Sequence, residues 1–266
     1  MKALLINPPS FVSQNEVMDR FQIITPPLGL AYLAGMLEHH EYPVKILDGV
    51  ALNLSLSKLK KSIKKEHPCI VGVTATTSQI FDALQVVKAA KEVCPECFTI
   101  IGGAHVTFLP LETMNDPLYG KYLDAVCIGE GEQTIYDLTK SLEKNNGDLS
   151  AVRGIAYRKS KSIKINEPRP LIEDLDSLPG PARHLLPMDR YKLLGKKEDI
   201  GHIYTSRGCP FNCIFCSSSK ILGNRFRARS PESVVEEFEH MVSEYDPMTI
   251  EFVDDLFTLN RKRVTK

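Results

Sequence analysis

Three cysteines within one short segment are the residues best suited to chemistry. Cys209, Cys213 and Cys216 form a C-x3-C-x2-C pattern. Three soft thiolates on one loop can converge on a soft metal centre. Iron–sulfur clusters are held by cysteine thiolates, normally four, so three cysteines on a cubane cluster would leave one iron open to a substrate or cosubstrate. The spacing also differs from the C-x2-C-x2-C-x3-C run of electron-transfer ferredoxins.

Two other interpretations of this cysteine cluster stay open. Structural zinc takes four ligands, usually as two separated pairs or together with histidine. After Cys216 the sequence has no further cysteine, and its one histidine, His240, falls in the middle of a helical pattern. A three-plus-one zinc site is therefore one alternative. Three unrelated, reduced thiols are the other.

Composition places the chain among ordinary globular proteins. It has 266 residues, of which 43% are hydrophobic and 25% charged, with 33 basic and 33 acidic side chains. These values exclude a disordered tail, a collagen-like repeat and a low-complexity scaffold. A net charge of zero provides no overall field toward nucleic acid or an anionic membrane. At about 150 residues per domain, the length predicts just under two domains.

The compartment is predicted from the cysteines and from the lack of long apolar runs. The apolar run at the N-terminus is too short for the core of a signal peptide, and no run approaches the ~18 residues of a membrane span. Seven cysteines are an odd set and do not indicate a disulfide framework. We therefore expect a cytoplasmic protein with reduced thiols. Cys69 and Cys127 lie in apolar runs and are predicted to be inert core residues.

The first half of the chain alternates apolar runs with helical patterns. Five runs are typical of strands, at 2–7, 44–48, 69–74, 98–101 and 124–128, and the helical patterns cover 27–38, 57–66, 78–94 and 132–144. This alternation predicts an α/β fold with a doubly wound, Rossmann-like parallel sheet.

Small and polar residues follow each of these predicted strands. The segments are Asn7-Pro8-Pro9, Asp48-Gly49, Thr74-Ala75-Thr76-Thr77, Gly102-Gly103-Ala104-His105 and Gly129-Glu130-Gly131-Glu132. Such a sheet binds ligands at the carboxyl ends of its strands. A row of glycine and threonine there lets a large ligand approach the backbone closely. Glu130 and Glu132 also suit the N-terminus of the helix that follows.

The second half of the chain changes character. A polar-tipped hairpin is predicted at 153–166, followed by a proline-rich linker at 168–187. Strands are predicted at 202–206 and 249–253, with a helix at 230–245 that Ser230 caps and Pro231 begins. We divide the chain into an α/β domain at 1–150, a hairpin and linker at 151–198, and a second domain at 199–266.

The cysteine segment and its flanks resemble the radical S-adenosylmethionine (SAM) superfamily. The shared features are the three cysteines, the aromatic Phe215 before the last of them, the lead-in 204–210, and the arginines at 225, 227 and 229. The resemblance implies that Cys209, Cys213 and Cys216 bind a [4Fe-4S] cluster whose open iron chelates SAM. Reductive cleavage would give a 5′-deoxyadenosyl radical. It further implies that Asp254 or Asp255, after the second strand, holds the SAM amino group.

The N-terminal segments look like the cobalamin-binding domain that precedes many radical SAM domains. The matching segments are 26–34, 102–107 and 129–132, in this order. The relatives include anaerobic magnesium-protoporphyrin ester cyclase-like proteins and cobalamin-dependent methylases. The resemblance implies a cobalamin pocket formed by strand-end residues, namely Thr74, Thr76, Gly102, Gly103, His105, Gly129, Glu130 and Gly131.

One feature departs from the usual cobalamin domain. Such domains carry D-x-H-x-x-G, whose histidine ligates cobalt, whereas Asp48 here is followed by Gly49 and Val50. The lower axial ligand therefore has no assigned residue. His105 is the runner-up, although a loop histidine beside two glycines more commonly forms hydrogen bonds.

The resemblance implies an enzyme that uses a [4Fe-4S] cluster, SAM and cobalamin on a small-molecule substrate. The reaction would be radical methyl transfer or oxidative cyclisation, with a reductant such as ferredoxin or flavodoxin, and with neither nucleic acid nor a membrane span. The alternative is a non-catalytic cobalamin-binding or ligand-binding module with an incomplete iron–sulfur domain. A radical SAM domain resembles a partial TIM barrel of six β/α units, and only its first units fit after residue 199. We therefore expect a C-terminally truncated chain that does not complete turnover, and a helix starting at Leu259.

Overall fold

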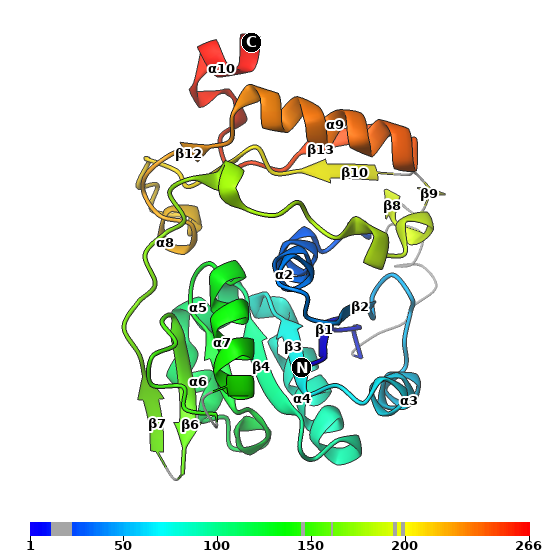
Figure 1. Ribbon diagram of the computed structural model, residues 1–266, viewed down its shortest axis with the longest axis vertical. Helices are drawn as coiled ribbons and strands as arrows, with labels where there is room; N and C mark the ends of the chain where they lie inside the picture. The colour runs from blue at the N-terminus through cyan, green and yellow to red at the C-terminus, as the bar shows by residue number, and fades with distance from the viewer. Residues whose placement is uncertain (12–22, 145–146, 161, 194–195, 198–199) are drawn as a thin grey trace.

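The computed structural model describes residues 1–11, 23–144, 147–160, 162–193, 196–197 and 200–266. Figure 1 shows a larger α/β unit that contains the N-terminus and a smaller unit that contains the C-terminus. The predicted helix end at 145–147 lies partly outside the described residues.

The larger unit is built on one mixed sheet. Its parallel strands are β1 (Ala3–Asn7), β2 (Val44–Asp48), β3 (Ile70–Thr74), β4 (Phe98–Gly102) and β5 (Ala125–Cys127). Two antiparallel strands, β6 (Ile155–Lys159) and β7 (Ser162–Ile165), extend it to the order β2-β1-β3-β4-β5-β6-β7. The order of the first five strands is that of flavodoxin-like doubly wound sheets, which bind ligands where the strand order reverses. The five predicted parallel strands are confirmed.

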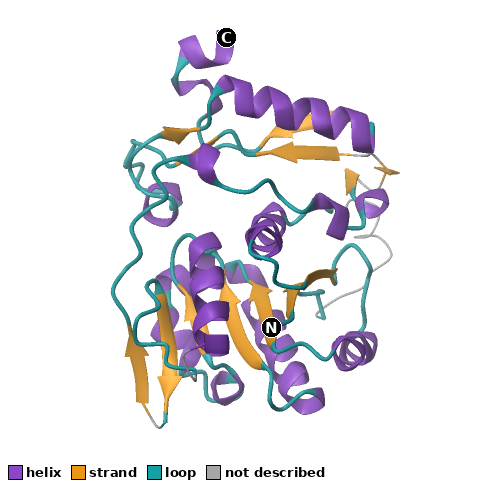
Figure 2. Ribbon diagram, viewed as in Figure 1, coloured by secondary structure: helices purple, strands orange, loops and turns teal. Residues whose placement is uncertain are grey.

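Helices cover both faces of this sheet (Figure 2). One face packs against α2 (Leu28–His39) and α7 (Glu132–Lys144). The other packs against α3 (Leu56–Glu66) and α4 (Ile80–Val93), together with the short helices α5 (Ala104–Phe108) and α6 (Pro110–Met114).

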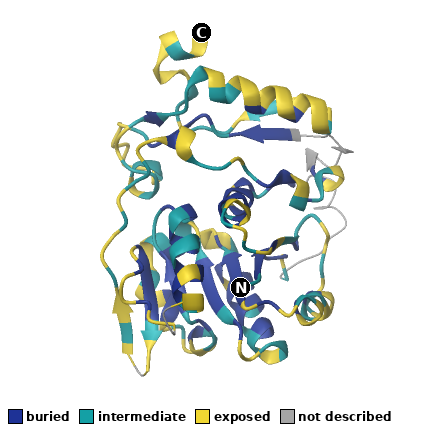
Figure 3. Cartoon of the chain, in the orientation of Figure 1, coloured by how far each residue is buried: buried dark blue, intermediate teal, exposed yellow. Residues whose placement is uncertain are grey.

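Strand β1 shows why the sheet must be covered twice. Ala3 and Leu5 belong to the core on the α2 side, and Leu4 and Ile6 to the core on the α3 side. A parallel strand buried on both faces is apolar throughout, because successive side chains point to opposite sides. In Figure 3 the central strands of the sheet are coloured as buried.

The hairpin β6–β7 belongs to the large sheet. Strand β6 pairs with β5 through Ala125 opposite Tyr157 and Cys127 opposite Ile155. The sheet therefore continues to Ile165, beyond the domain boundary that the sequence suggested at residue 150. The division into 1–150, 151–198 and 199–266 stays a prediction.

The smaller unit contains one parallel strand–helix–strand motif. Strand β10 (Ile200–Ile203) pairs with β13 (Thr249–Phe252), and α9 (Pro231–Tyr245) connects them. Ser230 caps this helix, since its hydroxyl accepts a hydrogen bond from Ser233 N at 3.2 Å, and Pro231 is its first residue, as predicted.

Short elements complete the smaller unit. They are β8 (Lys192–Leu193), β9 (Lys196–Lys197), β11 (Ser206–Arg207), α8 (Ser218–Ile221), β12 (Arg227–Ala228) and α10 (Arg261–Thr265). Single 3-10 turns occur in both units and in the linker, at Thr77–Gln79, Gly120–Tyr122, Leu175–Ser177, Arg183–Leu185, Met188–Arg190 and Phe257–Leu259. The helix expected to start at Leu259 instead begins at Arg261. Asn260 caps it by accepting a hydrogen bond from Arg263 N at 3.2 Å.

None of the helices in the described ranges has the length and apolarity that a membrane span needs.

A buried carboxylate fastens the linker to the larger unit. Asp48, at the end of β2, is fully buried and accepts hydrogen bonds from Asn7 Nδ2 at 2.9 Å and from Val50 N and Ala51 N at 3.1 Å. Its other oxygen accepts a hydrogen bond from the Tyr191 hydroxyl at 3.0 Å. Burial raises the pKa of Asp48, whereas the hydrogen bonds from these four donors stabilise its charged form.

We expect Tyr191→Phe to lower the free energy of unfolding by about 1–3 kcal/mol, because one oxygen of a buried carboxylate loses its only described donor. Tyr136→Phe is the matched control, since that ring stacks on His40 and its hydroxyl has no hydrogen-bond partner among the described residues. Denaturant midpoints of the two variants provide the test. Equal shifts in both would contradict the role given to Tyr191.

Candidate functional site

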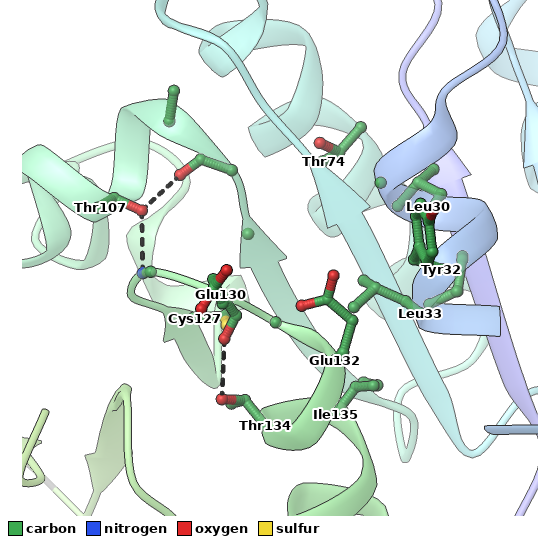
Figure 4. A pocket seen from close by; sticks show the side chains of 18 of the residues that line it. Leu30, Tyr32, Leu33, Thr74, Thr107, Cys127, Glu130, Glu132, Thr134 and Ile135 are labelled. Carbon is green, nitrogen blue, oxygen red and sulfur yellow. Dashed lines mark hydrogen bonds between the residues drawn. The ribbon is translucent and has the colours of Figure 1, made fainter. Parts of the chain in front are cut away.

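A pocket opens at the carboxyl ends of β3, β4 and β5, beneath the smaller unit. Its volume is about 320 Å³, and Figure 4 shows most of its lining side chains. The larger unit supplies Leu5, Gly29, Leu30, Tyr32, Leu33, Gly72, Val73, Thr74, Ile100, Gly102, Gly103, Ala104, Thr107, Cys127, Gly129, Glu130, Gly131, Glu132, Thr134 and Ile135. The smaller unit supplies Tyr204, Arg207, Ile221 and Leu222. The pocket is thus mainly apolar, as small-molecule sites are, and both units form it.

Two consecutive glycines open the backbone at the end of β4. A Cβ at Gly102 would meet only the Cβ of Cys127, at 3.7 Å, so the space above it belongs to the pocket. Gly103 has a φ of +104°, and a Cβ there would come within 2.7 Å of the Ala75 carbonyl oxygen. Only glycine suits that position, because the backbone is in the left-handed half of φ and has no room for a side chain.

Six of the eight residues predicted for a cobalamin pocket line this cavity. They are Thr74, Gly102, Gly103, Gly129, Glu130 and Gly131. Thr76 and His105 are not among the lining residues. Thr76 closes the turn before α4 by bonding Gln79 Oε1, and His105 Nδ1 lies 3.3 Å from Thr77 Oγ1. Burial lowers the pKa of His105.

Thr107 is a pocket residue that the sequence interpretation missed. Its hydroxyl donates to the Gly103 carbonyl at 2.9 Å and accepts from Gly129 N at 3.2 Å (Figure 4). It therefore joins the turn after β4 to the turn after β5. The sequence signal was present, because Thr107 is in the segment 102–107 on which the resemblance rests.

The side chain of Glu130 is occupied by protein partners. Its carboxylate forms ion pairs with Arg207 and Arg227, each at 3.0 Å. It also accepts a hydrogen bond from Ile172 N at 2.8 Å. The side chains of Glu130 and Arg227 are each 2% exposed, so these contacts lie in a dry environment. Glu130 therefore joins the turn after β5 to the linker and to the smaller unit.

Glu132 completes the same arrangement. Arg207 donates a hydrogen bond from one terminal nitrogen to Glu130, at 3.0 Å, and one from the other to Glu132, at 2.6 Å. Its guanidinium carbon lies 5.5 Å from the centre of the Tyr32 ring. Burial works against the charged form of Arg207, but Glu132 and Glu130 outweigh it and raise its pKa. For Tyr32, in contrast, burial is the main cause that raises the pKa, to about 12. We call Glu130, Glu132, Arg207 and Arg227 the Glu130 network.

The cysteine loop starts directly from this network. Arg207 pairs with Arg227 in the two-residue ladder of β11 and β12, and Cys209 N donates to the Gly223 carbonyl at 3.1 Å. Gly208, between them, has a φ of +84°, and a Cβ there would come within 2.2 Å of the Arg225 carbonyl oxygen. The base of the loop is therefore narrow and admits only glycine at position 208.

The three cysteines of the loop are free thiols. Cys209 is half-buried, whereas Cys213 and Cys216 are exposed, and a turn places Cys216 N 3.1 Å from the Cys213 carbonyl oxygen. Cys216 Sγ lies 3.5 Å from Ser218 Oγ, and hydrogen bonding from Ser218 lowers the pKa of this thiol. Phe215 points outward and is 89% exposed.

The donor set of this loop suits an iron–sulfur cluster in kind, because it offers three free thiols within eight residues. Within the described ranges, however, no three histidine, cysteine, aspartate or glutamate side chains are already arranged around a common point that could hold a metal. Cluster binding would therefore include closure of the exposed loop on the metal.

The two aspartates after β13 differ in their surroundings. Asp254 accepts hydrogen bonds from Thr205 N at 2.7 Å, Ser206 Oγ at 2.6 Å and the Thr205 hydroxyl, so it fixes the turn after β10. Asp255 is exposed, and its charge only partly opposes the hydrogen bonding from Ser218 that lowers the pKa of Cys216. Burial is the main cause that raises the pKa of Tyr204, and the charge of Asp255 adds to it. In the described part of the chain Asp255 forms no hydrogen bond or ion pair, and its charge reaches the cysteine loop at Cys216.

The prediction of a buried core position is wrong for Cys69. This residue is exposed, because it lies just before the amino-terminal end of the central strand β3 and outside the buried part of the sheet. Cys127 is buried as predicted, and it also lines the pocket, where burial raises its pKa to about 12.

The chain is similar to known proteins over nearly its whole length. Residues 17–139 match the family model of the B12 binding domain. The chain is 46% identical to an uncharacterized methyltransferase of Pyrococcus horikoshii, over 99% of this chain and 55% of the relative. It is 32% identical to the anaerobic magnesium-protoporphyrin IX monomethyl ester cyclase of Rubrivivax gelatinosus, over 99% of this chain and 46% of the relative.

Two solved structures share the fold. The methyltransferase TsrM from Kitasatospora setae, with cobalamin and a [4Fe-4S] cluster bound, aligns with a TM-score of 0.73 at 18% identity, over 97% of this chain and 48% of that one. The cobalamin-dependent SAM radical enzyme OxsB, with aqua-cobalamin and SAM bound, aligns with a TM-score of 0.77 at 20% identity, over 96% of this chain and 34% of that one. At these identities the likeness establishes the fold alone.

The chain spans about half the length of the curated relatives it matches. The activities of those whole proteins enter below as proposals. The expected C-terminal truncation gains no support from the comparisons and stays a prediction.

We expect Glu130→Gln to destabilise the protein by about 3–5 kcal/mol, because a buried charge pair loses one partner while two arginines stay buried. Glu173→Gln is the matched control. Glu173 pairs with Arg225 at 2.7 Å in an exposed position, and its loss should cost about 0–1 kcal/mol. Chemical denaturation of both variants measures the difference. Similar losses would show that the Glu130 network does not carry this share of stability.

Proposed function

We propose that the chain is the cofactor-binding part of a cobalamin-dependent radical SAM enzyme. One observation carries the proposal: residues that line the pocket at the strand ends lead directly into the cysteine loop. Tyr204 and Arg207 line the pocket, and two residues after Arg207 the loop begins at Cys209. Residues that would hold cobalamin and residues that would hold a cluster are thus adjacent.

In this proposal Cys209, Cys213 and Cys216 hold a [4Fe-4S] cluster. When bound, the cluster supplies the electron for reductive cleavage of SAM. The base of the loop, closed by Gly208 and by the bond from Cys209 N to Gly223, fixes the first ligand, and the exposed Cys213 and Cys216 are free to close on the metal. Phe215, exposed beside Cys216, would then cover the cluster or SAM and exclude water.

Of the two aspartates, Asp255 is our candidate to hold the SAM amino group. Asp254 already accepts three hydrogen bonds from residues 205–206, whereas Asp255 is exposed and within electrostatic reach of Cys216. A carboxylate can accept the hydrogen bonds of an ammonium group and balance its charge. Asp254 would then act indirectly, by holding the turn that leads to the cysteine loop.

Cobalamin would occupy the pocket at the strand ends, where Gly102, Gly103 and Gly129 let a large ring approach the backbone. The described lining residues include no histidine, and His105 lies outside them. We therefore propose that the pocket would hold cobalamin without a histidine ligand. Leu30, Leu33 and Ile135 would provide an apolar lining that excludes water from the pocket.

The reaction is radical methyl transfer or oxidative cyclisation of a small molecule, with electrons from a ferredoxin or flavodoxin. The names of the relatives support both reactions, since one is a methyltransferase and the other a cyclase. A specific observation also favours a second candidate, a cobalamin-binding module without catalysis: the cysteine side chains do not yet converge within the described structure. Iron binding separates the two candidates.

We expect anaerobic reconstitution of the chain with iron and sulfide to yield about four iron atoms per chain and a brown protein. Cys213→Ala should lose most of this iron, because only two loop thiolates remain. Cys69→Ala, which removes an exposed free cysteine outside the loop, is the control and should keep it. Iron analysis after desalting is the measurement. Full iron in Cys213→Ala, or zinc in a colourless protein, would refute the cluster.

We expect hydroxocobalamin to stay bound through gel filtration and Gly102→Leu to weaken its binding by tenfold or more. Space beside Gly102 permits the new side chain, which would fill the pocket at the end of β4. Gly180→Leu is the control, since position 180 is open and outside this pocket. Titration followed by visible absorbance compares the two. Unchanged affinity in Gly102→Leu would place cobalamin elsewhere.

A further inference from the structure

Arg207 belongs at once to the pocket, to the Glu130 network and to the start of the cysteine loop. Its guanidinium bonds Glu130 and Glu132 at 3.0 and 2.6 Å, and it lines the pocket together with Glu132. Its backbone forms the last pair of the β11–β12 ladder, directly before Gly208 and Cys209. No other lining residue of the pocket adjoins the three cysteines so closely along the chain.

Stability alone is a weak reason for such a network. Removing several charges from water costs more than most single ion pairs return, and apolar replacements of buried pairs are often neutral or stabilising. What the network provides is a fixed orientation of the Arg207 side chain. Arg207 is bonded on two sides by carboxylates of one turn, and the planar guanidinium fixes both bonds in one geometry.

We propose that Arg207 is a positioning residue that couples the occupancy of the pocket to the conformation of the cysteine loop. By bonding Glu132, Arg207 holds residues 207–209, the base of the cysteine loop, against the side of the pocket that the larger unit forms. A ligand in the pocket packs against Arg207, Glu132 and Tyr204 and therefore stabilises the loop base. Conversely, a cluster on the loop stabilises the pocket wall, because coupling between two binding sites is reciprocal. The proposal rests on the proposed function for the identity of the two ligands.

Backbone hydrogen exchange of the ligand-free chain tests the positioning part. Cys209 N, bonded to the Gly223 carbonyl, reports on the loop base. In Glu132→Gln we expect this amide to exchange about tenfold faster or more, because Arg207 loses a charged partner. Arg207→Lys, which keeps the charge but not the two-sided bond, should behave alike. Helix α4, which does not line the pocket, is the internal reference, and Glu173→Gln, exposed in the linker, is the control variant.

The same measurement with hydroxocobalamin tests the coupling. In the wild-type chain and in Glu173→Gln, saturating hydroxocobalamin should slow exchange at Cys209 by about tenfold. Glu132→Gln and Arg207→Lys are compared at hydroxocobalamin concentrations that visible absorbance shows to saturate each variant, since both positions line the pocket. In both variants the protection at Cys209 should disappear, while exchange in α4, which does not line the pocket, is unaffected. This dependence on the ligand distinguishes positioning from a merely structural role.

Two results would overturn the proposal: equal exchange at Cys209 in the wild type and in both variants, or protection by hydroxocobalamin that survives in them. Failure of hydroxocobalamin to stay bound to the wild type would refute the proposed cobalamin site. The comparison of ligand-free variants would still decide the role of Arg207, so the two failures are distinguishable.

Discussion

The buried carboxylate of Glu130 is the interaction on which the arrangement of the two units depends. It accepts hydrogen bonds from Arg207 and Arg227 of the smaller unit and from the backbone of Ile172 in the linker. A carboxylate removed from water must be compensated by donors, and here the donors come from three separate segments. Because all three must be in place together, the turn after β5, the linker and the base of the cysteine loop take one mutual position.

Other contacts of the linker fix the position of the two units relative to each other. Tyr191 bonds Asp48 at the end of β2, and Ala182 N donates to the Ala31 carbonyl of α2 at 2.9 Å. Arg183 of the linker bonds Glu237 of α9, which also pairs with Arg229. The linker therefore follows α2 along much of its length. As a result the pocket lies under the smaller unit, with Tyr204 and Arg207 in its wall.

The regular elements were predictable because their signals are local. The apolar runs became parallel strands, Ser230 and Pro231 began α9, and the small residues after β3, β4 and β5 surround a pocket. Strands β11 and β12 were missed, since two residues have no periodicity. The exposure of Cys69 was missed because an apolar run does not show where its strand begins.

The role of Glu130 could not be predicted from the sequence for a different reason. A glutamate between two glycines at a strand end fits a cofactor pocket, yet its partners Arg207 and Arg227 are 77 and 97 residues away along the chain. Pairing over such a separation depends on the tertiary fold. The alternating arginines at 225, 227 and 229 were noticed only as part of a resemblance. In the structure they divide between an exposed pair with Glu173, the Glu130 network, and Glu237.

In the function proposed here, the pocket and the cysteine loop form one site for two adjacent cofactors. Electron paramagnetic resonance of the chain carrying both a reduced [4Fe-4S] cluster and cob(II)alamin tests it most directly, because two unpaired spins in neighbouring sites broaden and shift each other's signals. We expect a spectrum that differs from the sum of the spectra of the chain with each cofactor alone. A spectrum equal to that sum, with both cofactors bound in full amount, would contradict it.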